Sequence, residues 1–240
     1  MSEVQLPQFF VDTSSASEID ALIGLRIFSG ITTNPVIVAK EAGNTEPINY
    51  YRNLAERYPD LPISIQLLDE PLSELVDHAI EFSGIGPNVV VKIPMFTDGR
   101  GLKLLPRLID LGIKTNITAI MSAEQALMVL KAGDGKGPEY ISLFFNRIKD
   151  GGGDPVQEIS NTRALIDHLG LKTKIITGSI RKPEGAQATM DVRQAVMAGT
   201  HIITIPPTRI WEMVSHPQSE LFINQSQSNW EKYLMSQSES

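Results

Sequence analysis

The stretch NVVVKIPMFTDGRGLKLLPRLIDLGIKTNITAI, residues 88–120, holds the pattern from which the fold can be predicted. It begins with a short β-branched run, NVVVKIP (88–94), of the kind found in strands buried on both faces. A longer amphipathic segment, GLKLLPRLIDLG (101–112), follows and ends in glycine, as helices commonly do. A second β-branched run, KTNITAI (114–120), closes the unit. This order predicts two parallel strands joined by a crossover helix.

The same unit recurs along the chain. The predicted strands are 8–13, 29–34, 63–68, 88–94, 114–120, 140–145, 174–179 and 201–206. The predicted helical segments are 18–25, 48–58, 72–82, 101–112, 123–133, 155–170 and 191–199. Because no long linker separates the units, we expect a single domain, 1–240, folded as a closed (β/α)8 TIM barrel of the α/β class.

Two segments do not belong to the repeating unit. The C-terminal stretch ELFINQSQSNWEKYL predicts an added amphipathic helix at about 219–235, and the residues after it, 236–240, are expected to be a disordered tail. The loop after the seventh strand, residues 181–189, is irregular and could contain a short helix.

Composition and charge exclude several classes of function. The chain is 42% apolar, enough to bury one sizeable core, and carries a net charge of −7 with no basic block. That charge argues against nucleic acid or a membrane surface as a partner. The chain has no cysteine, which excludes disulfides, thiolate metal sites and cysteine nucleophiles. Since no signal-peptide pattern or membrane-spanning apolar run is found, we expect a cytoplasmic protein.

Polar residues gather at or near the ends of the predicted strands. They are Asp12, Asn34, Gln66, Lys92, Asn116, Thr118, Ser142 and Ser179. In such a barrel the loops after the strands build the active site, so these side chains are candidates for it. Polar groups inside a barrel are costly unless they serve each other or a ligand. Any one of them could instead cap a strand or satisfy loop backbone, but together they favour a site.

Lys92 is the most informative of these residues. It follows three valines and precedes Ile93 and Pro94, so its amine would emerge from an apolar wall. Burial disfavours the charged form of lysine, and a neutral amine can attack a ketone to form a Schiff base. The alternative is a lysine that reaches solvent from the strand end or pairs with Asp12 or Asp98. Spacing alone leaves both interpretations open.

Two arginines give a second signal, for an anionic ligand. Arg147 follows the sixth predicted strand and Arg181 follows the seventh. Loops after the late strands of such barrels often bind phosphate, and guanidinium groups match phosphate oxygens bidentately. The glycines at 151–153 lead into Asp154 and Pro155, which predicts a hinge into a helix rather than a phosphate cradle.

The segments that carry these signals resemble a known family. VDTSSASEI, SGITTNP, VVVKIP, TNITAI, YISLFFNRI and GSIR follow one another in the order and spacing of the transaldolase family. The resemblance is to its short-chain branch, which includes the fructose-6-phosphate aldolases. It covers about residues 8–235, and the pair ITTNP and VKIP is specific to it.

The resemblance implies a role for each candidate residue. It implies Lys92 as the Schiff-base lysine and Asp12 as the acid/base for a substrate hydroxyl proton. It implies Thr118 as the holder of the catalytic water, with Gln66 in the same water relay. The residues implied to bind substrate are Asn34, Asn116, Ser142, Phe144, Arg147, Ser179 and Arg181. Of these, Arg147, Ser179 and Arg181 would hold the phosphate.

The implied reaction uses an enamine and no metal or organic cofactor. A transaldolase passes a three-carbon dihydroxyacetone unit from a ketose phosphate, such as fructose 6-phosphate, to an aldose phosphate, as in the pentose phosphate pathway. A fructose-6-phosphate aldolase releases dihydroxyacetone instead. Gln66 stands where similar transaldolases carry glutamate, whereas Phe144 is the transaldolase residue where the aldolases use tyrosine. Phenylalanine gives the water network no hydroxyl, so we favour the transaldolase.

Other interpretations stay open at this point. The same anion site could hold a sulfonate, which would make the substrate a sulfo-sugar, or the barrel could bind sugar phosphates without catalysis. A metal-dependent aldolase would need ligands converging at the strand ends, and the histidines, at 78, 168, 201 and 216, lie elsewhere. The resemblance also implies a homo-oligomer, a pentamer or a decamer, that uses the C-terminal helix.

Overall fold

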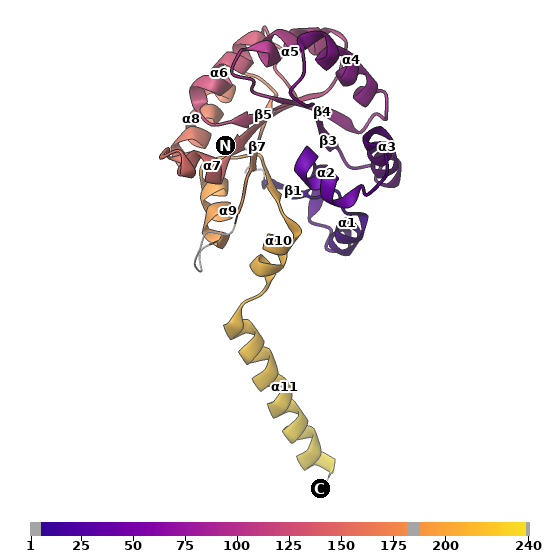
Figure 1. The fold of residues 1–240 in the computed structure, drawn as a ribbon. Coiled ribbons are helices and arrows are strands. Elements are labelled where there is room, and N and C mark those ends of the chain that lie inside the picture. The colour runs from indigo at the N-terminus through magenta and orange to yellow at the C-terminus, as the bar shows by residue number, and fades with distance from the viewer. Residues whose placement is uncertain (1–5, 182–187, 239–240) are drawn as a thin grey trace.

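The computed structural model describes residues 6–181 and 188–238 (Figure 1). In this part of the chain, eight parallel strands close into a barrel in the order of the sequence, which confirms the predicted TIM barrel. The strands are β1 (Gln8–Asp12), β2 (Phe28–Thr32), β3 (Ile63–Gln66), β4 (Val89–Pro94), β5 (Thr115–Ile120), β6 (Tyr140–Phe144), β7 (Lys174–Gly178) and β8 (Ile202–Ile205). Each lies within two residues of its predicted bounds, because β-branched runs mark buried strands well.

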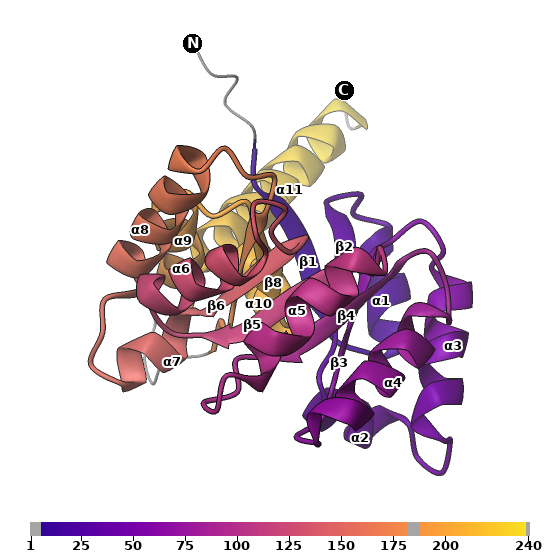
Figure 2. The ribbon, with the colours of Figure 1, turned by 90° about the horizontal axis from the view of Figure 1, so that it is seen from above.

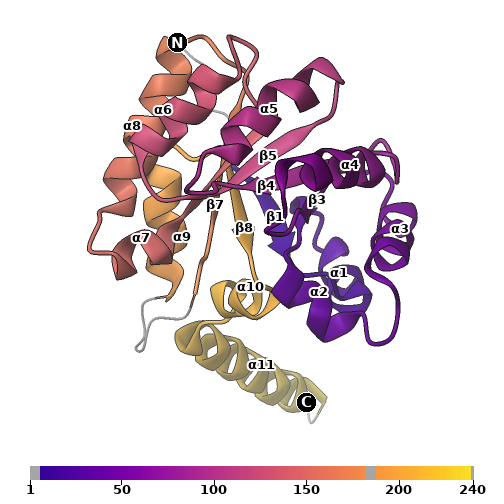
Figure 3. The ribbon, with the colours of Figure 1, turned by 45° about the horizontal axis from the view of Figure 1, so that its top comes forward.

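Helices surround the barrel (Figure 2) and cover the outer face of its strands (Figure 3). The helices of the described residues are α1 (Ala16–Ile23), α2 (Pro35–Glu41), α3 (Pro47–Arg57), α4 (Leu72–Ser83), α5 (Arg100–Asp110), α6 (Ala123–Ala132), α7 (Phe145–Asp150), α8 (Pro155–His168), α9 (Ala188–Met197), α10 (Pro207–Val214) and α11 (Pro217–Ser238). The prediction missed α2, α7 and α10, which have at most eight residues and begin within three residues of the end of a strand. The hinge into α8 is confirmed, since the Asp154 side chain accepts hydrogen bonds from the first turn.

The interior of the barrel has an apolar lower layer, here called the lumen floor. It consists of Phe10, Val90, Tyr140, Ile176 and Ile202, which form a cluster separate from the core between strands and helices. The rings of Phe10 and Tyr140 meet edge to face, with centroids 6.0 Å apart. Burying each such side chain contributes about 1.5–3 kcal/mol, so this layer stabilises the closed barrel.

Phe10 also explains a glycine in β2. A Cβ atom on Gly30 would lie 2.5 Å from the Phe10 ring, closer than two carbon atoms can approach. A side chain at position 30 and the ring at position 10 therefore compete for one volume inside the barrel.

Above the floor the barrel interior becomes polar. A second set of residues is here called the upper lumen. Each stands two positions after a floor residue on the same strand or, on β2, two positions after Gly30. They are Asp12, Thr32, Lys92, Ser142, Gly178 and Thr204. Because side chains alternate across a strand, positions two apart point to the same side. The strands thus present an apolar layer and then a polar layer to one interior.

The C-terminal helix α11 extends away from the barrel (Figure 1). It begins two residues before the predicted start at 219 and runs to Ser238, so residues 236–238, expected in a disordered tail, are helical. Residues 239 and 240, and 182–187 of the irregular loop, lie outside the described residues. None of the helices in the described ranges combines the length and apolarity needed to cross a membrane.

Candidate active site

A cavity of about 160 Å³ opens at the carboxyl ends of the strands, where the fold predicts the active site. Its lining includes the predicted site residues Asp12, Asn34, Lys92, Ser142, Phe144, Arg147 and Ser179, together with Thr32, Gly178 and Thr204. These residues come from the ends of six strands, the loops after them and helix α7. The structure therefore brings together most of the side chains that the sequence singled out.

Lys92 lies inside the barrel rather than at its surface. Its side chain is 5% exposed, and its Nζ donates a hydrogen bond to the Thr33 carbonyl oxygen at 3.0 Å. Burial lowers the pKa of Lys92, and the carboxylate of Asp12 partly opposes this shift. The alternative of a lysine that reaches solvent is wrong. A buried amine with a lowered pKa is more often neutral, and so more nucleophilic, than a surface lysine.

Asp12 is the last residue of β1, and its carboxyl group ends a hydrogen-bonded chain of two threonine hydroxyls. Thr32 Oγ1 donates to Asp12 Oδ1 at 2.7 Å, and Thr204 Oγ1 lies 2.5 Å from Thr32 Oγ1. Because the Thr32 hydrogen is used on the carboxylate, Thr204 is the donor of the second bond. Burial raises the pKa of Asp12, while Lys92 and the Thr32 hydroxyl lower it. A carboxyl group with a raised pKa can exchange protons nearer neutral pH.

Gln66, Lys92 and Asn116 form one row across β3, β4 and β5. Asn116 is fully buried and lies behind the cavity, where its Nδ2 donates to Ser64 Oγ at 3.1 Å. Ser142 Oγ donates to Asn116 Oδ1 at 2.7 Å. Ser142 lines the cavity, and Asn116, on the side away from the cavity, fixes the Ser142 hydroxyl.

Thr118 follows Asn116 on the same face of β5. Its Oγ1 is buried and has no hydrogen-bond partner within the described ranges. The next residue, Ala119, has a φ of 59°, and the β5–β6 register shifts between Ile117 and Ile120. A left-handed alanine inside a strand is strained, and such bulges often re-aim a side chain next to a functional site. A buried hydroxyl without a protein partner can hold a small polar ligand.

The two arginines of the predicted anion site differ in position. Arg147, on α7, lines the cavity beside Ser179, which follows β7. Arg181 is half exposed, and its guanidinium pairs with the Asp150 carboxylate. Arg181 is not among the described residues that line the cavity. The structure thus gives one end of the cavity a guanidinium and a hydroxyl, and holds the second guanidinium outside.

Residues 9–239 match a family described as Transaldolase/Fructose-6-phosphate aldolase. A probable transaldolase of Moorella thermoacetica is 35% identical over 228 residues, 94% of this chain and 98% of that protein. A probable transaldolase of Bacillus cereus is 34% identical over 227 residues, with the same coverage. This chain belongs to the transaldolase/fructose-6-phosphate aldolase family.

Solved structures that are similar agree in fold alone. The carboxyl transferase domain of Rhizobium etli pyruvate carboxylase has a TM-score of 0.59 and 10% identity, covering 84% of this chain and 40% of that chain. Orotidine 5'-monophosphate decarboxylase from Sulfolobus solfataricus has a TM-score of 0.57 and 12% identity, covering 83% of this chain and 88% of that chain. Both therefore support the barrel and carry no argument about chemistry.

Two residues of this transaldolase-family site, Thr32 and Thr204, are not among those predicted from the sequence. The signal that could have found them is spacing, because each stands two residues after an interior position, Gly30 or Ile202. Asn34 was predicted, but it has a structural duty as well. Its Oδ1 caps α2 by accepting from Val36 N and Ile37 N, which leaves its Nδ2 for the cavity that it lines.

The acidic and histidine side chains of this family member are dispersed. Throughout 6–181 and 188–238, no group of three or more His, Asp or Glu side chains is placed to hold a metal ion. His78 instead pairs with Glu70 at 2.6 Å, in the region after β3.

Proposed function

We propose that this enzyme is a Schiff-base transaldolase that moves a dihydroxyacetone unit from a ketose phosphate, such as fructose 6-phosphate, to an aldose phosphate. The observation that carries the proposal is Lys92, a buried amine with a lowered pKa that lines a cavity together with the Asp12 carboxyl group. Family membership supports the general reaction. Arg147 and Ser179 in the same lining offer donors for a phosphate.

The first half of the reaction would cleave the donor. The neutral Lys92 amine attacks the C2 carbonyl of the ketose, and the carbinolamine loses water to give an iminium ion. The buried Thr118 hydroxyl would hold that water. Asp12 then takes the proton of the C4 hydroxyl while the C3–C4 bond breaks. The aldehyde leaves, and the bond electrons remain as an enamine attached to Lys92.

The second half would run the same steps in reverse with an acceptor. The enamine carbon attacks the aldehyde carbon of an aldose phosphate, and the new alkoxide takes the proton back from Asp12. Water then hydrolyses the iminium and frees Lys92. The Thr204–Thr32–Asp12 chain supports this use of Asp12. The two hydroxyl groups can donate toward the carboxylate, and can reverse the direction of their hydrogen bonds when the carboxylate is protonated.

Transfer rather than release is favoured by Phe144. Its ring lines the cavity on β6 and brings no hydroxyl to a water that would hydrolyse the intermediate. The alternative, a fructose-6-phosphate aldolase, would release dihydroxyacetone. Both reactions share Lys92, so the products separate them.

Borohydride trapping tests the proposal. Fructose 6-phosphate with borohydride is expected to leave a reduced three-carbon adduct on Lys92, found by intact mass and peptide mapping. With erythrose 4-phosphate present and no borohydride, the expected product is a seven-carbon ketose phosphate; free dihydroxyacetone would indicate the aldolase. A sulfonate analogue of the donor used in preference to the phosphate would indicate a sulfo-sugar. An adduct on another lysine would contradict the mechanism.

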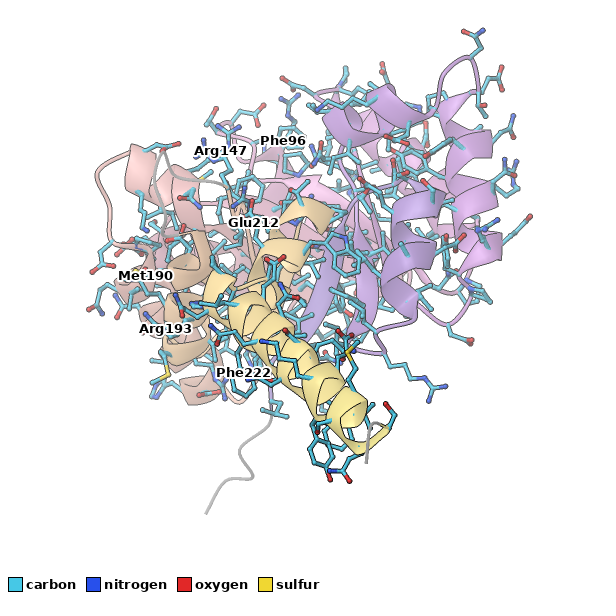
Figure 4. All side chains as sticks on the ribbon, turned by 90° about the horizontal axis from the view of Figure 1, so that it is seen from below. Phe96, Arg147, Met190, Arg193, Glu212 and Phe222 are labelled. Carbon is cyan, nitrogen blue, oxygen red and sulfur yellow. The ribbon has the colours of Figure 1, made fainter. Side chains whose placement is uncertain are left out.

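We also propose that the enzyme is a homo-oligomer whose copies pack through α11. The helix exposes Phe222, Ile223, Trp230 and Leu234, each at least half exposed, and Figure 4 shows Phe222 on it. A helix of this length whose apolar side chains face water gains no stability from tertiary packing. We infer that a second copy of the chain covers these side chains. Light scattering is expected to give an oligomer mass, and Phe222→Ser with Trp230→Ser a monomer mass. An unchanged mass would contradict the role of α11.

A further inference from the structure

We propose that Asn146 is a positioning residue that holds the anion-binding end of the cavity, with Asp191 and Lys149 fixing its amide. The inference rests on the proposed function, since it assumes a substrate with an anionic end at Arg147 and Ser179. It goes beyond that function because Asn146 does not itself line the cavity among the described residues.

Ser179 has a strained backbone conformation. This residue has a φ of 58°, in the left-handed region that residues other than glycine adopt at a cost. It stands directly after β7 and lines the cavity. Such a conformation persists only where the surroundings hold it. The question is what holds Ser179 there.

Asn146 supplies that restraint from α7. Its Nδ2 donates to the Ser179 carbonyl oxygen at 2.9 Å, and its backbone N–H donates to the same oxygen at 3.3 Å. A carbonyl oxygen has two lone pairs, and these two bonds use both. The next residue is Arg147. One residue thus ties the Ser179 carbonyl to the segment that carries the arginine of the site.

The Asn146 amide is itself fixed by a buried carboxylate. Nδ2 also donates to Asp191 Oδ2 at 3.0 Å, so each of its two hydrogens has an acceptor. Asp191, on α9, is 2% exposed, and Lys149 Nζ donates to its other oxygen at 2.6 Å. Lys149 lies 4.7 Å from the centre of the Phe145 ring. A buried carboxylate needs such a cation, and together the three side chains join α7, α9 and the end of β7.

This network has a different chemistry from the rest of the site. In the proposed mechanism the groups around Lys92 exchange protons with substrate, whereas Asn146 cannot titrate and uses both hydrogens of its amide on Ser179 and Asp191. Its expected contribution is geometric: it keeps the Ser179 hydroxyl and the Arg147 guanidinium aimed at one point. An anion there can be bound without either group reorganising.

The test compares phosphorylated and unphosphorylated substrates. Asn146→Ala is expected to raise KM for fructose 6-phosphate about tenfold with little change in kcat, and to weaken binding of inorganic phosphate measured by calorimetry to a similar degree. Borohydride adduct formation with unphosphorylated dihydroxyacetone is expected to be unchanged. The matched control is Asn161→Ala, an asparagine-to-alanine change on the exposed face of α8, which is expected to leave every value unchanged.

A double-mutant cycle tests whether Asn146 works through Ser179. In a Ser179→Ala background, where the hydroxyl is already gone, Asn146→Ala is expected to raise KM less than it does alone, because the two changes remove one interaction. If Asn146→Ala does not fold, Asp191→Asn keeps the side-chain volume and is expected to show the same selective rise in KM, but smaller.

Two results would overturn the inference. Equal losses with phosphorylated and unphosphorylated substrates would show that Asn146 supports the fold and not the anion site. Additive effects in the cycle would show that it does not act through Ser179. Failure of the proposed function looks different, since the wild-type enzyme would then form no borohydride adduct on Lys92.

Discussion

Phe10 and Asp12 stand two residues apart on β1, and Val90 and Lys92 stand two apart on β4. The first of each pair belongs to the lumen floor and the second to the upper lumen. All four face the barrel interior, yet the floor pair is apolar and the upper pair carries ionisable groups whose pKa values burial shifts. Burying the floor stabilises the protein, whereas burying the upper groups costs stability.

The contrast between the lumen floor and the upper lumen predicts which substitutions affect folding and which affect chemistry. Changes on the floor should lower the free energy of unfolding and leave the catalytic constants of the folded enzyme alone. Changes in the upper lumen should do the reverse, because groups held for reaction are rarely the best choice for stability. Neighbouring rows of one barrel can therefore be tested against each other.

Lys92→Met is expected to have the largest effect, a loss of turnover of at least about ten-thousandfold, because the proposed mechanism has no other nucleophile. Stability should not fall. The pKa of Lys92 is lowered in the folded state, so the folded protein binds this proton less tightly than the unfolded chain does. The charge is therefore unfavourable to folding below the unfolded pKa, and its removal raises stability there. A clear drop in melting temperature would contradict the comparison.

Asp12→Asn is expected to lower turnover by about a hundredfold to ten-thousandfold, since it removes the group that accepts the proton in the proposed bond cleavage. Adduct formation with dihydroxyacetone should survive. The Asp12 carboxylate raises the pKa of Lys92, so its loss should lower that pKa further. The acid limb of adduct formation, measured by borohydride trapping across pH, should move to lower pH. A shift to higher pH would show that Asp12 does not act on Lys92 in this way.

Ile176→Ala sharpens the comparison from the floor. The side chain is fully buried, and its truncation is expected to lower the free energy of unfolding by about 2–5 kcal/mol. Urea unfolding measures this loss, while kcat and KM are measured well below the unfolding transition. A fall in kcat with full retention of stability would mean that the floor takes part in the chemistry.

Arg147→Ala is expected to reduce kcat/KM for the phosphorylated ketose by a factor that corresponds to a free-energy loss of about 1.5–3 kcal/mol. This is the usual range for a hydrogen bond to a charged group. Arg181→Ala is expected to have a smaller effect, because its guanidinium pairs with Asp150 away from the cavity. Steady-state kinetics with fructose 6-phosphate and fructose compare the two. Equal losses for both arginines would mean that Arg181 moves into the site when substrate binds.

Gln66→Glu is expected to have the smallest effect, a rise in transaldolase turnover of less than about tenfold. Glutamine can orient a water beside Thr118 but cannot exchange a proton with it, and a carboxylate can do both. The variant should also add one ionisation to the pH–rate profile, measured as kcat from acid to neutral pH. Unchanged or lower turnover, with free dihydroxyacetone from the wild type, would favour the aldolase.

The sequence predicted the barrel and most of the cavity because both depend on short-range patterns. Strand runs showed where Asp12, Lys92 and Ser142 end up, since the carboxyl ends of parallel strands converge. Side-chain pairing could not be predicted in this way. That Asn116 lies behind Ser142, and that Arg181 pairs with Asp150, depends on register and loop geometry that no local pattern encodes. The left-handed backbone at Ala119 and Ser179 gave no signal, because neither residue is glycine.

The contact between Phe10 and Gly30 has a consequence for the ways in which this sequence can diverge. The two positions share one volume, so their substitutions are not independent. Gly30→Ala alone should be rejected in a variant library, but should become acceptable once Phe10 has been replaced by a smaller residue such as leucine. The order in which the two changes are acquired therefore matters, because a lineage that acquires Gly30→Ala before the change at Phe10 meets a poorly folded intermediate. Screens that randomise β1 and β2 separately will miss sequences that a paired library reaches.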